Sequence, residues 1–222
     1  MTDSASTQKL IQAVEQANSD DSLIESVRAL VANHSQEAIP TLIAVFGYNN
    51  PGAAVVAIEG LIEFGEPAVM PLLEQLDDYN YGARAYSIRA LATIADPRAL
   101  DVLVAAAATD FAPSVRRAAA KGLGNLNWHK LTPEQVPDAQ KNALHTLLEV
   151  SQDADWAIRY AAVVGLQSLA VGTTDMSELI QNQFEQMLTS ETDSSVRSRI
   201  LMAQQRLQDS KAIALVAAPS DS

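Results

Sequence analysis

The residues best suited to bind a ligand are aromatic side chains that lie near arginine or histidine in the sequence. They form three groups: Tyr79, Tyr81 and Tyr86 beside Arg84 and Arg89; Trp128 beside His129; and Trp156 beside Arg159 and Tyr160. Aromatic faces pack on flat conjugated groups, and a guanidinium binds a carboxylate through two parallel hydrogen bonds. The pattern indicates a site for a flat ligand that carries carboxylates, or an interface with a protein partner. Rings that only fill gaps between helices would give the same pattern.

Motifs of the common catalytic sites do not occur in this sequence. It contains no GxxxxGK, HExxH or GxSxG motif, and no cysteine, which excludes disulfides, thiolate zinc sites and a cysteine nucleophile within the chain. The histidines His34, His129 and His145 lie far apart in the sequence, so no metal site is expected.

The charge balance is acidic, with 15 Lys and Arg against 27 Asp and Glu and a net charge of −12. Phosphate backbones are bound by clustered basic residues, so the balance argues against a nucleic-acid-binding protein and suits a partner with a basic face. No segment approaches 18 uninterrupted apolar residues, and no signal peptide is recognisable at the N-terminus. We therefore expect no membrane span and a cytoplasmic location.

Internal repeats predict the elements that must position these residues. Residues 52–61 align with 82–91 at an offset of 30, and further copies follow at 113–123, 155–166 and 193–201. Each copy predicts two helices: the first has apolar residues at helical spacing, and the second follows a short turn, near Pro67 and Pro97 in two copies. A single helix pair cannot bury its apolar face alone, so the pairs must stack. The period and pattern resemble HEAT repeats and predict an all-α fold, an α-solenoid of HEAT-like helical pairs.

The repeats also set the expected domain organisation. We expect one repeat domain over residues 1–211, with an N-terminal cap at about 1–20, an insertion loop at about 125–138 and a flexible tail at 212–222. The starts of the first helices should share one edge, and most aromatic residues are expected in loops or at these starts. An arginine recurs at the starts of four of these first helices, at Arg84, Arg116, Arg159 and Arg197. These arginines either bind a carboxylate ligand or pair with an acidic residue of the adjacent repeat.

Three segments carry a resemblance to a known family. Residues 79–91, which begin Tyr-Asn-Tyr-Gly-Ala-Arg-Ala, together with 94–100 and 114–119, resemble the phycobilin lyase subunits of the E/F type. The match covers roughly residues 20–200 and is closest to the smaller β (F) subunits.

The resemblance implies a function. Such subunits pair with an E subunit, and the heterodimer attaches phycocyanobilin, an open-chain tetrapyrrole, by a thioether bond to a cysteine of a phycobiliprotein α subunit. This chain would then be a lyase subunit of the phycocyanin type, with the bilin as substrate and no permanently bound cofactor. Lyase-isomerases of the family have a His-Cys pair, whereas this chain has Trp128-His129-Lys130, which counts against isomerase activity. A non-catalytic adaptor, chaperone or phycobilisome degradation protein is the alternative.

The resemblance also suggests roles for individual residues. Arg84, Arg89 and Arg159 would bind the bilin propionates, and His129 or Asp155 would exchange protons with pyrrole nitrogens. Tyr81, Trp128 and Trp156 would stack on the tetrapyrrole or wall it in, and Tyr79 and Tyr86 complete the predicted bilin-binding set.

Overall fold

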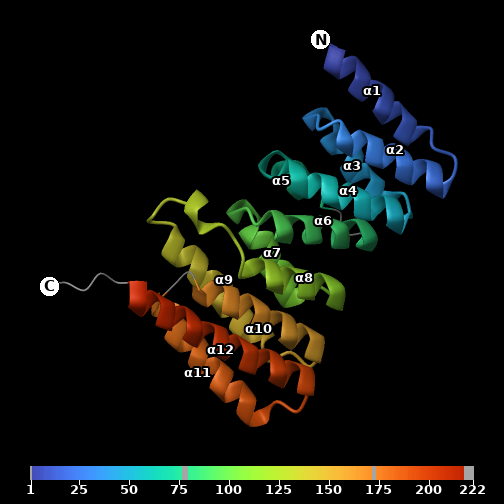
Figure 1. Cartoon of the computed structure of the whole chain (residues 1–222). Coiled ribbons are helices and arrows are strands. Elements are labelled where there is room, and N and C mark those ends of the chain that lie inside the picture. Colours follow the sequence, from blue (N-terminus) through green and yellow to red (C-terminus); the bar gives the residue numbers. More distant parts are fainter. Residues whose placement is uncertain (1, 77–79, 172–173, 218–222) are drawn as a thin grey trace. The chain divides into compact units, whose positions relative to one another are not determined.

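The computed structural model describes residues 2–76, 80–171 and 174–217, and every regular element in these ranges is a helix (Figure 1). The all-α prediction is therefore confirmed. The chain divides into two compact units, residues 1–99 and residues 100–222. No helix in the described ranges is both long enough and apolar enough to cross a membrane.

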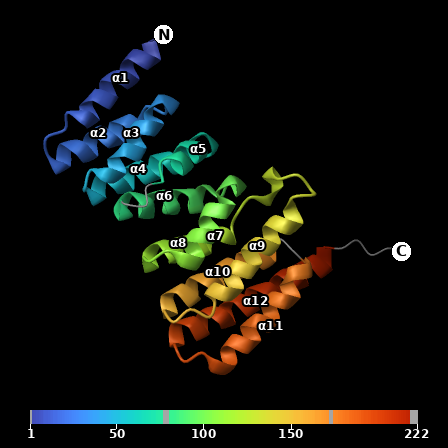
Figure 2. The same ribbon diagram turned by 180° about the vertical axis from the view of Figure 1, so that it is seen from behind.

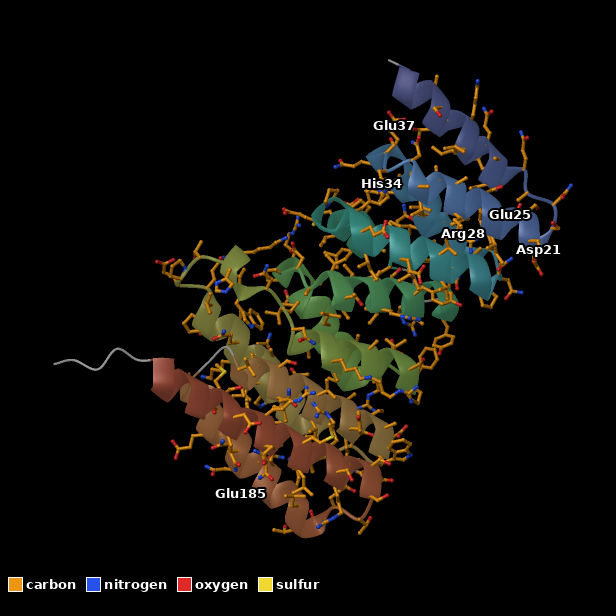
Figure 3. All side chains as sticks on the ribbon, viewed as in Figure 1. Asp21, Glu25, Arg28, His34, Glu37 and Glu185 are labelled. Carbon is orange, nitrogen blue, oxygen red and sulfur yellow. The ribbon has the colours of Figure 1, made fainter. Side chains whose placement is uncertain are left out.

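The first unit consists of short helices that pack against their sequence neighbours. Its elements are α1 (Thr2–Glu15), α2 (Asp20–Ala32), η1 (Gln36–Ala38), α3 (Ile39–Ala44), η2 (Val45–Gly47), α4 (Pro51–Phe64), α5 (Glu66–Glu74), α6 (Tyr81–Ile94) and η3 (Pro97–Ala99). α4 packs between α2 and α6, which brings the first helices of successive repeats into contact. The outer surface of α2 is charged and carries Asp21, Glu25 and Arg28 (Figure 3).

Local signals explain where these helices begin and end. Asn50 caps α4 because its side-chain oxygen accepts a hydrogen bond from the Ala53 amide at 2.9 Å, and Pro51 occupies the first helical position. Asn80 caps α6 in the same way, with its oxygen 3.0 Å from the Ala83 amide. Gly65 separates α4 from α5 with a φ of 65°, a conformation that residues with a Cβ rarely adopt.

The second unit contains first helices of successive repeats and the second helices that pack against them. Its elements are α7 (Leu100–Thr109), α8 (Pro113–Leu123), η4 (Trp128–Lys130), α9 (Val136–Val150), α10 (Trp156–Val171), α11 (Thr174–Ser190) and α12 (Ser194–Ala217). α10 lies between α8 and α12 and packs against both. Its buried residues Ile158, Ala162 and Leu166 recur at helical spacing, as the sequence predicts.

α8 and α10 approach so closely that their backbones touch. A Cβ added to Gly124 would lie 2.0 Å from the Gly165 carbonyl oxygen, and one added to Gly165 would lie 2.3 Å from the Ala120 oxygen. At the opposite end, Arg116 of α8 pairs with Asp153, which precedes α10. The two helices therefore run in the same direction, with their starts adjacent and their ends adjacent.

The structure adds detail to the predicted boundaries. First helices begin at Pro51, Pro113 and Ser194, close to the starts of the repeat copies at 52, 113 and 193, whereas α9 begins at Val136, inside the predicted insertion. α12 extends to Ala217 and includes part of the segment predicted as a tail, and residues 218–222 lie outside the described ranges. The assignment of one domain to residues 1–211 stays a prediction.

Candidate functional site

Two of the predicted aromatic residues line a pocket in the first unit. The pocket has a volume of about 350 Å³ and is lined by Phe46, Gly47, Asn49, Asn50, Pro51, Asn80, Tyr81, Gly82 and Tyr86. Tyr81 is the first residue of α6 and is 44% exposed. Tyr86 is half-buried, and its ring packs on Phe46 with 5.5 Å between centroids and an interplanar angle of 47°. Such a tilted pair leaves ring edges and faces for a flat ligand.

The walls of this pocket are held in place by the helix caps. The Asn50 side chain caps α4 and donates a hydrogen bond to the Asp20 carboxylate at 3.1 Å, so its position is fixed from both sides. Asn80 caps α6 directly beside Tyr81. Ligand pockets span roughly 300–1,000 Å³, so this one is at the small end and suits one or two small rings.

The other predicted residues of the first unit lie in different environments. Arg84 is buried, with 8% of its surface exposed, and Arg89 is exposed on α6. Burial of Arg84 means that removing it would disturb packing as well as any ligand contact. Tyr79 lies outside the described residues.

In the second unit, the guanidinium of Arg159 is already engaged. Its Nε and one terminal nitrogen donate to the two carboxylate oxygens of Glu191, each at 2.7 Å, and the other terminal nitrogen donates to the carbonyls of Asp153 and Ala154 at 2.9 and 3.0 Å. The hydrogen bonds between the two side chains lower the pKa of Glu191 and raise that of Arg159. A ligand carboxylate would have to displace Glu191, which is 4% exposed.

The same contact recurs along the second unit. Arg116 pairs with Asp153 and donates to the Ala107 carbonyl at 3.0 Å, and Arg197 donates to the carbonyls of Leu188 and Glu191 at 2.8 and 2.9 Å. For Arg116 and Arg159, the observed contact is the pairing with an acidic residue of the adjacent repeat. A polar pocket of about 370 Å³ surrounds the Arg159–Glu191 pair.

The structure separates the remaining candidates of the second unit. Trp156 begins α10 and is 49% exposed, and Asp155 caps the helix by accepting a hydrogen bond from the Ala157 amide at 2.8 Å. Trp128 and His129 follow the other end of α8, in η4, where His129 is exposed. Figures 1 and 2 show the turn before α10 and the segment between α8 and α9 at opposite ends of these helices.

The expectation of one shared edge is therefore wrong for Trp128, because the insertion follows the end of a first helix rather than preceding its start. From Trp156 to Gly165, which touches Gly124 before the insertion, α10 rises about 14 Å. His129 and Asp155 consequently do not form a catalytic pair in the structure. The described residues also hold no group of three acidic or histidine side chains that could bind a metal.

Two residues with functional potential were missed at the level of sequence. Phe111 is 74% exposed in the turn before α8, on the same edge as Trp156, and an aromatic residue just before Pro113 was the available signal. Arg199 of α12 is only 7% exposed, and it donates a 2.6 Å hydrogen bond to the side-chain oxygen of Gln167. Nothing in the spacing of Arg199 distinguished it from the neighbouring Arg197.

Comparisons with known proteins show which family this chain resembles. Residues 69–143 match the family model for HEAT repeats. The phycocyanobilin lyase subunit beta of a Nostoc species is 60% identical over 89% of this chain and 98% of its own length. A Synechocystis protein called phycocyanin alpha phycocyanobilin lyase CpcF is 48% identical over 87% of this chain and 91% of its own.

A solved structure, the complex of CpcE and CpcF of phycocyanin lyase from Nostoc, contains a chain that is 65% identical and superimposes with a TM-score of 0.74. The match covers 77% of this chain and 99% of that one. The relatives are thus matched over nearly their whole length. The chain belongs to the family of phycocyanobilin lyase β subunits.

Proposed function

We propose that this chain acts with a CpcE-type partner to attach phycocyanobilin to a cysteine of the phycocyanin α subunit through a thioether bond. The observation that carries the proposal is the 60% identity to a phycocyanobilin lyase subunit beta over 98% of its length. Two further relatives, the phycocyanin alpha phycocyanobilin lyase of Synechocystis and the CpcE–CpcF complex of Nostoc, support the α subunit of phycocyanin as the substrate protein and CpcE as the type of partner. We place this activity in the cytoplasm.

The reaction needs no resident cofactor. The thiol of the substrate protein adds across an exocyclic carbon–carbon double bond (an ethylidene group) on a terminal ring of the bilin: a sulfur–carbon bond forms, and the thiol proton ends on the bilin. Atoms and electrons balance without an oxidant or reductant. The contribution of the lyase is to hold the bilin and the cysteine in one productive geometry, which can supply a large share of a rate enhancement.

The pocket of the first unit is our candidate for part of this binding task. Tyr81 and Tyr86 would pack on a pyrrole ring, and the exposed Arg89 would reach a propionate. A pocket of about 350 Å³ encloses only part of a four-ring ligand, so other surfaces must cover the rest. This small size is consistent with a lyase that works as a heterodimer.

The second unit would contribute through separate regions. Trp156, at the start of α10, and Trp128, in η4, stay candidates for bilin contacts. Asp155, beside Trp156, and His129, beside Trp128, stay candidates for proton exchange. Arg159 acts by positioning, since its guanidinium holds Glu191 and the turn before α10. The insertion reads Trp128-His129-Lys130 without a cysteine, and we propose addition without isomerisation.

Co-expression in a heterologous host tests the proposal. The host would produce phycocyanobilin, the phycocyanin α subunit, the CpcE-type partner and this chain, and bilin fluorescence on a denaturing gel would report covalent attachment. We expect fluorescence only when both lyase chains are present. A stable complex of the two chains without pigment attachment, beside a working lyase pair as control, would instead support an adaptor role.

A further inference from the structure

A buried arginine without a carboxylate partner lies between α10 and α12. Arg199 is 7% exposed, and within the described part of the chain its hydrogen bond goes to the neutral side chain of Gln167. Arg116 and Arg159 of the same unit, which are also largely buried, are both paired with carboxylates. Burying a charge without a counter-charge is costly, so a site that keeps one is a candidate for binding an anion.

A second arginine, Arg206, lies close enough to Arg199 to affect its pKa. Burial lowers the pKa of Arg199, and the nearby Arg206 lowers it further, whereas Tyr160 raises it. The guanidinium stays protonated in any case. The chain has a net charge of −12, yet among the residues that the structure describes neither Arg199 nor Arg206 is paired with a carboxylate.

Helical spacing places these groups on one strip along the contact between α10 and α12, in which Arg199 and Gln167 are buried and Arg206 is exposed. On α12, Arg199, Met202 and Arg206 follow one another at intervals of three and four residues, and Met202 is 52% exposed. On the adjacent α10, Tyr160 and Gln167 are seven residues apart and so lie on one face. The strip combines an aromatic ring, a thioether and two guanidinium groups, which suits a flat apolar molecule that carries carboxylates.

We propose that Arg199, assisted by Arg206, Gln167 and Tyr160, binds a propionate carboxylate of phycocyanobilin on the α10–α12 face. The inference rests on the proposed function and names a second contact region for the same substrate. The carboxylate would neutralise the positive charge of Arg199 and accept two parallel hydrogen bonds from its planar guanidinium group. Gln167 would orient the guanidinium from the other side.

The test compares phycocyanobilin with its dimethyl ester, in which both propionates are blocked. Absorbance titrations of the heterodimer with its CpcE-type partner would give the dissociation constant of each compound. We expect Arg199→Met to weaken binding of the free acid by about 10- to 100-fold and to leave ester binding nearly unchanged. The thermal midpoint should stay equal or rise, because replacing a buried charge that lacks a counter-charge with an apolar chain is often stabilising.

Arg116→Met is the matched control, because it removes a paired arginine of the same unit. It should lower the thermal midpoint by stranding Asp153, while the preference for acid over ester persists. If Arg199→Met does not fold, Arg206→Met is tested instead, because Arg206 is exposed and its loss should not disturb the fold. This variant should bind the free acid about fivefold more weakly and the ester with unchanged affinity.

Three results would overturn the inference. The first is an undiminished preference for the free acid in the Arg199 variant. The second is an equal loss of affinity for acid and ester, which would show that Arg199 maintains the shape of the site and does not bind a carboxylate. The third is a loss of binding to the CpcE-type partner with normal bilin binding, because Arg199 would then pair with a carboxylate of the partner protein and not of the bilin. Failure of the unmodified heterodimer to bind either compound would instead refute the proposed function itself.

Discussion

Substitution of Gly165 by alanine tests how closely α8 and α10 must pack. The added Cβ would lie 2.3 Å from the Ala120 carbonyl oxygen and 2.8 Å from a Leu147 methyl group, whereas carbon–oxygen contacts are normally about 3.3 Å or longer. The obstructing atom is backbone, so α8 and α10 would have to separate by about 1 Å. Overpacking of this kind costs up to about 3 kcal/mol, and the better helix propensity of alanine returns about 1 kcal/mol.

The net expectation for Gly165→Ala is a loss of about 2 kcal/mol in the free energy of unfolding, or about 4–8 °C in the thermal midpoint of a chain of this size. Thermal unfolding followed by circular dichroism measures it directly. Gly82→Ala is the matched control, because its Cβ would meet only Asn80 Oδ1 at an ordinary 3.6 Å. It should leave the midpoint unchanged or raise it slightly. A Gly165 variant as stable as the original chain would refute the close-packing argument.

Three further substitutions follow from single contacts. Because Arg159 holds the pKa of Glu191 below its ordinary value of 4.5, the stabilisation by this pair is fully present above that pH and is lost as the pH falls through the folded pKa. Glu191→Gln should therefore cost about 3 kcal/mol near pH 7, and the difference in midpoint from the original chain should shrink below about pH 4; a pH-independent difference would contradict the assignment. Asp155→Ala removes the α10 cap and should cost about 1 kcal/mol in chemical denaturation, and no loss would show the cap to be dispensable. Tyr81→Ala, at a 44% exposed position, should slow bilin transfer about tenfold in a fluorescence assay with little change in midpoint, and an unchanged rate would remove Tyr81 from the site.

Much of the fold could be predicted because its signals are local. Asn50 followed by Pro51 starts a helix through contacts within four residues, and a recurring arginine marks four of the first helices, at Arg84, Arg116, Arg159 and Arg197. The pairing of Arg159 with Glu191 spans 32 residues. Pairing with an adjacent repeat is one of two alternatives that the sequence allows for this arginine, but no pattern in the sequence decides between that contact and a ligand.

The candidate site was harder to predict because it depends on which end of a helix each loop follows. Trp128 and Trp156 look alike in the sequence, each beside a basic residue, yet one follows the end of α8 and the other begins α10. Arg84, which the resemblance suggested as a ligand of the bilin propionates, is buried, and its position near the start of α6 gave no sign of this. Arg199 was overlooked because burial without a counter-charge is visible only when α10 and α12 are placed side by side.

The rate of bilin attachment with purified components is the most direct test of whether this chain acts as a lyase subunit. The phycocyanin α subunit and phycocyanobilin would be mixed with the CpcE-type partner, with and without this chain, and the adduct followed by absorbance and mass spectrometry. We expect fast formation of one homogeneous thioether adduct at one cysteine only when both lyase chains are present. The same rate and the same single product without this chain would contradict this expectation.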